Sequence, residues 1–201
     1  MENSLDKLTE QLKRKYFVEL EASGRHVHLT KEQAITLFGH DLTEARPLSQ
    51  PGQFLAAERV NVVGPKGKLE QVAVLGPCRK AAQVEISMTD GRILGIAPKV
   101  RLSGNVEGTD GICLTGPKGT VTLQQGVIAA QRHIHMTPED AALQGVKQGA
   151  VVKLKTLTAR PVIFEDVSVR ISSSFQTYAH LDFDEANACG YQKGDLGMIL
   201  P

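Results

Sequence analysis

Several features are scarce in this chain of 201 residues, and each scarcity excludes a class of protein. The chain has no tryptophan, and aromatic residues make up 4% of it, so it lacks the aromatic platforms on which single-stranded nucleic acids stack. Its formal net charge is +1, without the basic excess that is typical of proteins that bind DNA, RNA or anionic membrane surfaces. We therefore expect neither a nucleic-acid partner nor a membrane partner.

Long hydrophobic runs are also missing. No apolar stretch approaches the roughly 20 residues that cross a bilayer, and the charged segment MENSLDKLTEQLKRKY lacks the apolar region of a signal peptide. The three cysteines, Cys78, Cys113 and Cys189, are odd in number and far apart, which is typical of reduced thiols and not of a disulfide framework. The sequence therefore predicts a cytoplasmic protein.

The composition that is present belongs to an ordinary globular protein, with 41% hydrophobic and 22% charged residues. The segments RVNVVGPKGKLEQVAVLG and GICLTGPKGTVTL each hold two β-rich runs around a Gly-Pro-Lys-Gly turn, the pattern of a hairpin. A further run, QVEIS, precedes a Thr-Asp-Gly sequence that we interpret as a turn at residues 89–91. Many short strands with regular turns predict a mainly β fold, a barrel or a sandwich.

Few segments carry helical signals. In residues 4–16, Leu5, Leu8, Leu12 and Tyr16 recur at helical spacing, which predicts an amphipathic helix with a narrow apolar stripe. That stripe fits two interpretations: a surface helix that packs on its own domain, or a helix that docks into the groove of a partner. Shorter helices are predicted after the capping residues Thr30, Thr137 and Asp182.

Four of the six histidines occupy two matching phrases. RHVHLT contains His26 and His28, and RHIHMT contains His133 and His135. Each phrase runs into a short capped helix that ends at a glycine, and the second phrase follows the first by 107 residues, counted from His26 to His133. Duplication of such a unit at half the chain length predicts two pseudo-equivalent halves.

The spacing within each phrase points to metal binding. Residues i and i+2 of a strand point to the same face, so each phrase presents two imidazoles side by side. Two imidazoles supply half of a tetrahedral zinc site, and the doubled phrase therefore predicts two metal ions. The remaining ligands must come from elsewhere, and the residue types leave four candidates open: Glu85, His180, Asp182 and His40.

A metal ion beside the N-terminus of a helix favours an anion such as phosphate or a carboxylate. Two arginines are candidates to bind that anion through paired hydrogen bonds, Arg79 in LGPCRKAAQVEIS and Arg170 in VSVRI. Each is also open to interpretation as an ordinary solvated arginine.

Five blocks in order carry a family resemblance: SGRHVHLT, PLSQPGQF, VLGPCRKAAQVEIS, GVIAAQRHIHMTPEDA and HLDFDEANA. Together, from about Phe17 to the C-terminus, they resemble the phosphate propanoyltransferases of the propanediol-utilisation type. The resemblance implies a mainly β fold of two small β-barrels with short capping helices, built from pseudo-repeat halves whose chain is interleaved. It implies an enzyme that interconverts acyl-CoA (propanoyl-CoA or acetyl-CoA) and phosphate with acyl-phosphate and coenzyme A.

The resemblance also implies two divalent metal ions, usually zinc, and a set of site residues. By motif, one ion is expected on His26, His28 and Glu85 and the other on His133, His135 and His180. Arg79 is expected to be the catalytic phosphate anchor, with Arg170 as a second candidate for phosphate. The expected coenzyme A contacts are Ala22, Ser23, Gly24, Arg46 and Asn187.

For the domains, the resemblance implies an N-terminal amphipathic extension at residues 1–16. One barrel is expected from residues 17–24 with 131–201, the other from residues 25–36 with 58–130, and residues 37–57 are expected to form a small inserted excursion. In some relatives such an extension directs the enzyme into a bacterial microcompartment, so a shell or cargo protein is a candidate partner, as is a second copy in a homo-oligomer.

As a hypothesis, the acyl group passes directly from the thioester to phosphate at a di-zinc centre, with no enzyme nucleophile. Cys78, next to Arg79, is the rival covalent nucleophile. Two alternatives come from other classes of protein: a dimetal hydrolase of phosphate esters, and a non-enzymatic β-barrel assembly protein held together by zinc.

Overall fold

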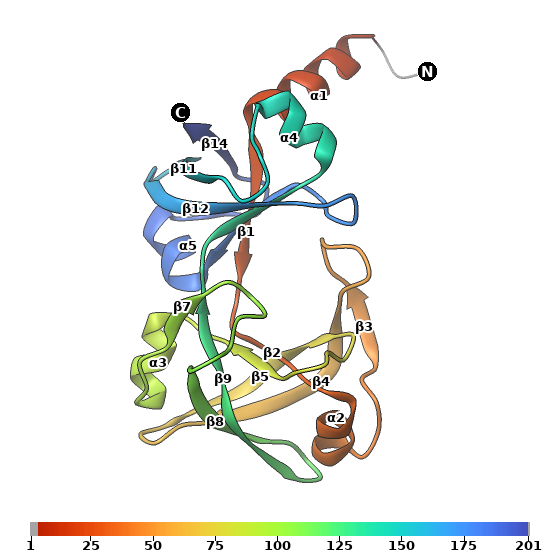
Figure 1. Cartoon of the computed structure of the whole chain (residues 1–201), viewed down its shortest axis with the longest axis vertical. Helices are drawn as coiled ribbons and strands as arrows, with labels where there is room; N and C mark the ends of the chain where they lie inside the picture. The colour runs from red at the N-terminus through yellow and green to blue at the C-terminus, as the bar shows by residue number, and fades with distance from the viewer. Residues whose placement is uncertain (1–3, 201) are drawn as a thin grey trace. The chain divides into compact units, whose positions relative to one another are not determined.

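The structure is a computed structural model that describes residues 4–200, and it divides into two compact units (Figure 1). Unit 1 combines the N-terminal residues up to Ser23 with the chain from Arg132 onward, and unit 2 is Gly24–Gln131. In the residues described, no helix has both the length and the apolar character needed to cross a membrane.

Unit 1 is a closed barrel of six strands in the order β1-β13-β10-β12-β11-β14, and β14 pairs with β1 to complete the ring. Its buried core includes Leu20, Ile134 and Leu154, which the alternation of each strand directs inward. The elements of unit 1 are α1 (Ser4–Tyr16), β1 (Val18–Ser23), β10 (His133–Met136), α4 (Pro138–Gln144), β11 (Val151–Leu157), β12 (Ile163–Ile171), β13 (Tyr178–Asp182), α5 (Phe183–Cys189) and β14 (Leu196–Leu200).

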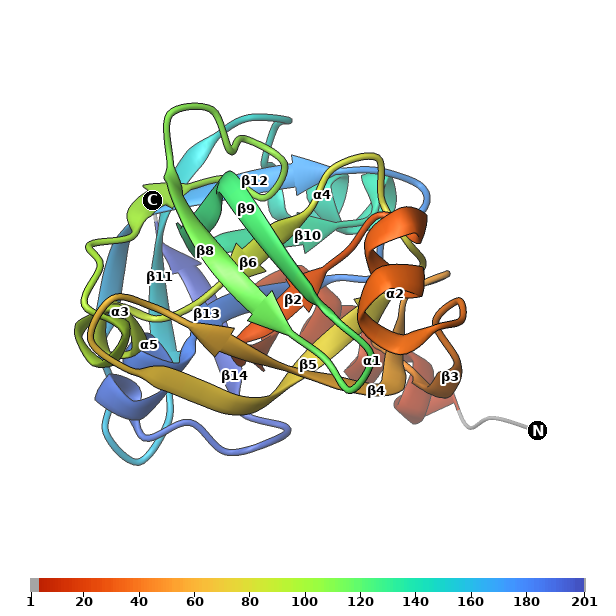
Figure 2. The same ribbon diagram turned by 90° about the horizontal axis from the view of Figure 1, so that it is seen from below.

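Unit 2 also closes on itself, because β4, β5, β2, β6, β9 and β8 pair in that order and β8 pairs again with β4 (Figure 2). The short strands β3 and β7 are added at its edges, on β4 and β9. The elements of unit 2 are β2 (His26–His28), α2 (Lys31–Phe38), β3 (Glu44–Pro47), β4 (Phe54–Val63), β5 (Lys68–Gly76), β6 (Gln83–Glu85), α3 (Met88–Leu94), β7 (Lys99–Arg101), β8 (Asp110–Thr115) and β9 (Thr120–Ala130).

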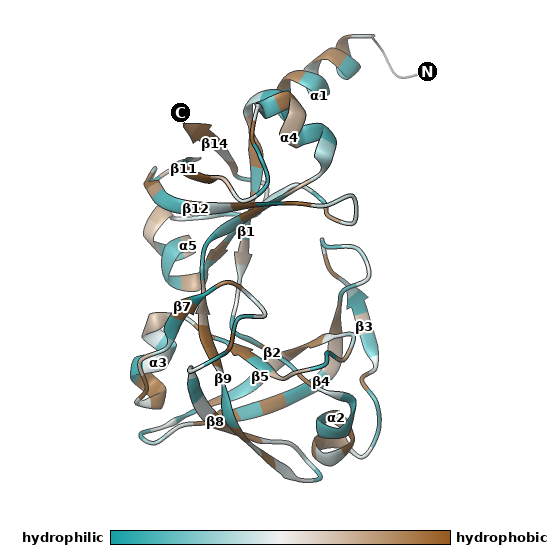
Figure 3. Ribbon diagram, viewed as in Figure 1, coloured by the Kyte–Doolittle hydropathy of each residue, from teal (hydrophilic) through white to brown (hydrophobic). Residues whose placement is uncertain are grey.

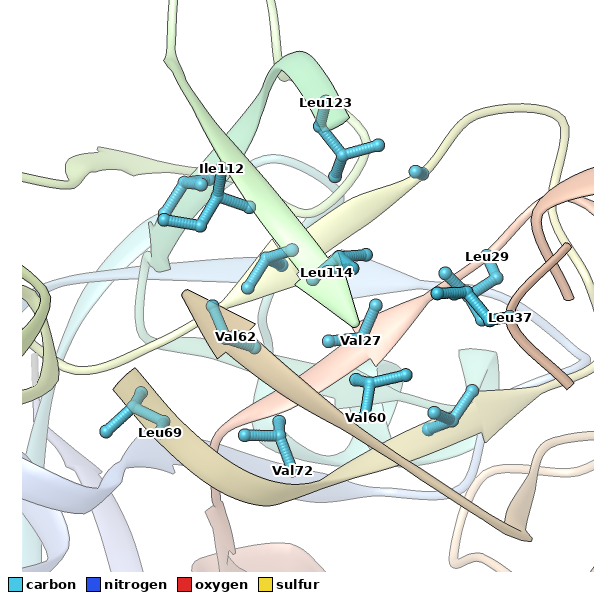
Figure 4. Packing of buried hydrophobic residues seen from close by; sticks show 14 of the residues in the cluster. Val27, Leu29, Leu37, Val60, Val62, Leu69, Val72, Ile112, Leu114 and Leu123 are labelled. Atoms are coloured by element: carbon cyan, nitrogen blue, oxygen red, sulfur yellow. The ribbon is translucent and has the colours of Figure 1, made fainter. Parts of the chain in front are cut away.

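The interior of unit 2 is filled by aliphatic side chains from every side of the barrel (Figure 4). Val27, between the two histidines of β2, is fully buried in this core, and Leu114 on β8 and Val60 on β4 pack in the same cluster. Because successive residues of a strand point to opposite faces, the burial of Val27 fixes both neighbouring imidazoles on the other face.

The two barrels repeat the same strand pairings. In each, the strand with the histidine pair (β2 or β10) has one parallel neighbour (β5 or β12) and one antiparallel neighbour (β6 or β13). That antiparallel neighbour then pairs in parallel with β9 in unit 2 and with β1 in unit 1. The chain therefore exchanges its strands: β1 precedes β2 in sequence but belongs to the other barrel, and β9 precedes β10 in the same way.

Details of backbone conformation repeat as well. Gln71 on β5 and Asp166 on β12 both have the left-handed conformation that is uncommon outside glycine, with φ of 53° and 55°. Thr30 and Thr137 cap the helices α2 and α4, as the sequence predicts. The predicted fold class is thus confirmed: two β-barrels with short helices, pseudo-repeat halves and an interleaved chain.

The interpretation of residues 89–91 as a turn is wrong, because they lie in α3. Ser87 caps this helix: its Oγ accepts the N–H of Asp90, and a carboxylate oxygen of Asp90 accepts the N–H of Ser87. This reciprocal pair is a capping box, which outweighs the turn preference of Thr-Asp-Gly.

Helix α1 forms where predicted, but its apolar stripe is not buried, and Figure 3 shows brown and teal segments alternating along it. Polar contacts join it to α4 of the same unit: Arg14 forms ion pairs with Asp140 and Glu139. The amide of Gln144 donates to the carbonyls of Arg14 and Phe17.

Residues 37–57, predicted as an excursion, contain the end of α2 and the edge strand β3, and they lie in unit 2. The predicted domain limits themselves stay a prediction.

Candidate metal centre

Unit 2 brings His26, His28 and Glu85 together. The two histidines lie on β2, and Glu85 lies directly opposite His26 on the antiparallel strand β6. The Nε2 atoms of the histidines are 3.2 Å apart, and Glu85 Oε1 is 3.5 Å from His26 Nε2 and 3.8 Å from His28 Nε2. All three side chains are buried, so the lone pairs of their Nε2 and Oε1 atoms face one another with little access to water.

The surroundings prepare this triad for a cation. His26 Nδ1 is 2.8 Å from the carbonyl oxygen of Gly24, which accepts a hydrogen bond from the Nδ1–H and so leaves Nε2 as the ligand atom. Burial, followed by the charges of His26 and Arg79, lowers the pKa of His28 well below its usual value, so its imidazole is neutral. Burial opposes ionisation of Glu85, but the charge of His26 and the hydrogen bonds from His26 and Ser103 outweigh it and lower the pKa of this carboxyl.

A small polar network holds Glu85 in place. The amide of Gln83 donates to Glu85 Oε1 at 2.5 Å and to Ser103 Oγ at 2.8 Å, and its own oxygen accepts the N–H of Gly104. Ser103 also donates to Glu85 Oε1, at 3.0 Å. Gln83 and Ser103 were not among the residues predicted from the sequence; the i and i+2 spacing of Gln83 and Glu85 on one strand was the available signal for Gln83.

Unit 1 assembles the second triad, His133, His135 and His180. His133 lies directly opposite His180 on the antiparallel strands β10 and β13, the same relation as that of His26 and Glu85. The ring centroids of His133 and His135 are 4.7 Å apart, and those of His133 and His180 are 4.9 Å apart. In both triads all the candidate ligand atoms lie within 4.8 Å of one another.

His135 shows most clearly that this triad fits a metal ion. Both of its ring nitrogens are buried and have no hydrogen-bond partner among residues 4–200. The ring of Phe175 stacks on it with centroids 4.0 Å apart, and burial, followed by the charges of His133 and Arg170, lowers the pKa of His135 to about 3. A buried, neutral imidazole whose ring nitrogens make no hydrogen bond fits the role of a metal ligand.

Glu21 orients the ring of His180, since Glu21 Oε2 is 3.3 Å from His180 Nδ1. A carboxylate behind a histidine selects the tautomer and strengthens the ligand nitrogen. The donor sets, two nitrogens with one oxygen and three nitrogens, suit zinc and leave a coordination position for a substrate.

The structure does not place the other two ligand candidates in a triad. His40 is exposed and is 3.7 Å from Glu58, and Asp182 caps α5 through the N–H of Glu185. Among residues 4–200, the two triads are the groups whose ligand atoms converge.

Each triad has a nearby arginine. Arg79 Nη1 is 3.3 Å from Ser103 Oγ, so a single hydroxyl separates it from Glu85. Arg170 lies beside His135 on the parallel strands β12 and β10, with its guanidinium 5.8 Å from the ring centroid of Phe175. The two predicted phosphate residues therefore lie at different triads.

The expected coenzyme A contacts divide between the units. Ala22 and Ser23 end β1, where Ser23 lies beside Asp182 at the start of α5, and Asn187 lies on that helix. Gly24 belongs to unit 2, where its carbonyl contacts His26, and Arg46 lies exposed on β3. The structure thus groups Ala22, Ser23 and Asn187 around α5.

Cys78, the rival nucleophile, is an unactivated thiol. Its Sγ donates to Asp41 Oδ1 at 3.5 Å, and burial, followed by that carboxylate, raises the pKa of the thiol. A protonated thiol is a poor nucleophile.

Comparisons with known proteins agree with the family resemblance of the sequence. A family model described as phosphate propanoyltransferase matches residues 19–192. The phosphate propanoyltransferase of Clostridioides difficile (strain 630) is 48% identical over 206 residues, which cover 100% of this chain and 99% of that protein. The phosphate propanoyltransferase of Listeria monocytogenes is 55% identical over 185 residues, with 91% and 87% covered. That of Enterococcus faecalis is 55% identical over 184 residues, with 90% and 87% covered.

Proposed function

Because this chain belongs to the phosphate propanoyltransferase family and is thereby an acyltransferase, we propose that it exchanges an acyl group between coenzyme A and phosphate with two bound zinc ions. One ion is assigned to His26, His28 and Glu85, and the other to His133, His135 and His180. The observation that carries this proposal is the repeated register, which puts a third ligand opposite the first histidine of each pair.

Zinc held by the three protein ligands of a triad would supply Lewis-acid polarisation of a carbonyl and an affinity for sulfur, which suits a thioester substrate. The protein contributes a rigid, buried set of donors on paired strands, so little reorganisation is needed when charge develops on the reacting group. Gln83 and Ser103 keep Glu85 aimed at its triad, and Glu21 does the same for His180.

Arg79 is the proposed phosphate anchor. A guanidinium binds two phosphate oxygens at once and remains charged at any working pH, so it fixes both the position and the orientation of the nucleophile. Ser103 links Arg79 to Glu85, which supports phosphate binding next to the triad of unit 2. Arg170 is the second candidate, at the triad of unit 1.

For coenzyme A, we propose contacts at Ala22, Ser23 and Gly24, with Asn187 on α5 and Arg46 on β3. A basic residue such as Arg46, exposed on an edge strand, suits the phosphates of the nucleotide tail. Both propanoyl-CoA and acetyl-CoA are proposed substrates.

Residues 1–16 are proposed to direct the enzyme to a shell or cargo protein of a bacterial microcompartment in the cytoplasm, in a propanediol-degrading pathway. Leu5, Leu8, Leu12 and Tyr16 support this, because they are exposed by 66%, 52%, 47% and 49%. Residues 1–3 of this extension lie outside the part of the chain that the structure describes.

The test is release of free thiol from propanoyl-CoA by the purified protein, with and without phosphate, together with the zinc content of the same sample. We expect thiol release that depends on phosphate, stoichiometric formation of acyl-phosphate, and two zinc ions per chain. Phosphate-independent thiol release, or hydrolysis of phosphate esters in place of acyl transfer, would contradict the proposal.

A further inference from the structure

An arginine directly precedes each histidine pair, and in unit 2 it reaches an acidic residue far along the chain. Arg25 Nη2 is 3.3 Å from Asp90 Oδ1, and the Asp90 carboxylate is buried, with 3% of its side chain exposed. The other oxygen of Asp90, Oδ2, accepts the backbone N–H of Ser87, the residue that caps α3. One carboxylate thus holds both the start of α3 and the arginine before β2.

Unit 1 repeats this arrangement with different residues. Arg132 Nη1 is 2.7 Å from Glu185 Oε1, while Glu185 Oε2 accepts the backbone N–H of Asp182, the capping residue of α5. Arg132 is held further by the carbonyl of Glu165, which accepts from its Nε at 2.6 Å. In both units the third residue of the helix divides its two oxygens between the helix cap and the arginine.

The position of this contact relates it to the metal ligands. Each arginine is one residue before the first histidine of its pair, and each capping residue is two residues after the third ligand, Glu85 or His180. The strands are short: β2 and β6 are three residues each, so few ladder hydrogen bonds fix their register. The ion pair adds a second connection between the two strands at the end where the first and third ligands meet.

We propose that Arg25 and Arg132 are positioning residues that keep the third metal ligand of each triad in register with its histidine pair. This inference rests on the proposed function for the existence of the metal sites. It assigns to each arginine one site only, because the two contacts lie in separate units. Fixing ligands through their outer contacts typically changes metal affinity by about 10- to 100-fold.

The test is titration of the metal-free protein with Zn2+ in competition with a coloured chelator, for wild type, Arg25→Gln and Arg132→Gln. We expect wild type to bind two ions, Arg25→Gln to bind one of them about 10- to 100-fold more weakly, and Arg132→Gln to weaken only the other. Arg25→Lys keeps the charge and is expected to recover part of the affinity.

Arg14→Gln is the matched control. Arg14 also pairs with a buried carboxylate on the third residue of a helix, Asp140 of α4, but it lies on α1 and on no ligand strand. We expect wild-type zinc affinity in this variant. An equal loss of affinity in Arg14→Gln would overturn the inference, because any lost surface ion pair would then have the same effect.

Asp90→Asn separates positioning from helix capping, because asparagine still offers an oxygen to the N–H of Ser87 but no charge to Arg25. We expect Asp90→Asn to bind zinc as weakly as Arg25→Gln does. The double variant Arg25→Gln/Asp90→Asn should show no further loss of zinc affinity. Thermal unfolding of the metal-free variants checks that each one is folded. Wild-type affinity in the folded Arg25→Gln, Arg132→Gln and Asp90→Asn variants would refute the inference and leave the metal sites intact, whereas a wild type that binds no zinc would refute the sites themselves.

Discussion

His133 lies directly opposite His180 across the antiparallel strands β10 and β13. The equivalent positions in unit 2 hold His26 and Glu85, so one register supplies an imidazole as third ligand in one barrel and a carboxylate in the other. The position of the third ligand is therefore a property of the duplicated barrel, while its chemical type differs between the halves. The triad that contains Glu85 has one negative charge more than the triad that contains His180.

Each triad is expected to bind one ion independently. We predict that His26→Ala and His133→Ala each lower the zinc content from two ions per chain to one, because a site with two remaining ligands binds zinc weakly. Metal analysis after dialysis measures this directly. His40→Ala is the control, since His40 is exposed and outside both triads, and two ions should remain. Loss of both ions in either ligand variant would contradict independent sites.

Arg79 is expected to act on phosphate and not on the acyl donor. Replacing it by alanine removes a charge-assisted contact of about 1.5–3 kcal/mol, so the KM for phosphate should rise by about 10- to 100-fold, with a lower kcat. Arg79→Lys retains the charge without the paired hydrogen bonds, so its KM for phosphate should lie between those of wild type and Arg79→Ala. Steady-state kinetics with phosphate as the varied substrate measures the effect. An unchanged phosphate dependence in Arg79→Ala would exclude the assigned role.

Cys78 is expected to be dispensable. Its thiol donates to Asp41, and its raised pKa keeps it protonated, so Cys78→Ala should keep activity within about twofold of wild type. The same phosphate-dependent thiol assay applies. A complete loss of activity in a folded, zinc-loaded Cys78→Ala sample would instead support a covalent acyl-enzyme.

The stability of the metal-free protein is expected to fall on acidification because of His135. The pKa of His135 is lowered from 6.5 to about 3 in the folded chain, so between these values the unfolded chain binds more protons. The contribution of the neutral His135 to the free energy of unfolding is present above pH 6.5. It is lost as the pH falls toward 3, at about 1.4 kcal/mol per pH unit. Urea unfolding at pH 7 and pH 4.5 should show a smaller decrease in the free energy of unfolding, by about 2–3 kcal/mol, for His135→Gln than for wild type. Equal decreases would show that His135 does not titrate in this way.

The apolar stripe of α1 and the barrel core are expected to respond differently to truncation. Leu8 is 52% exposed, so Leu8→Ala should change the free energy of unfolding by less than about 0.5 kcal/mol. Leu114 is fully buried, and Leu114→Ala should cost about 2–5 kcal/mol, because it removes apolar contacts and leaves a cavity. Chemical denaturation of the two variants provides the comparison. A large loss in Leu8→Ala would show that the stripe packs on its own domain after all.

Local patterns in the sequence were enough to predict several features of this protein. The spacing of His26 and His28 around Val27 predicts their shared face, because alternation is a property of any strand. The capping residues Thr30 and Thr137 predict the starts of α2 and α4, since a cap depends on a hydrogen bond to a residue three positions away. The repeated phrase predicts two equivalent halves, and the family resemblance names both triads.

Spacing alone left four candidates for the third ligands, and strand pairing in the tertiary structure is the physical reason why two of them complete the triads. Only the tertiary structure shows how Gln83, Ser103, Arg25 and Arg132 support the triads. Glu85 and His180 were selected over His40 and Asp182 by strand pairing between segments that are distant in sequence. The supporting contacts likewise join β2 to α3 and β10 to α5. Periodicity and capping depend on interactions within a few residues. Barrel closure and strand exchange depend on the free energy of packing the whole chain, which a local pattern does not predict.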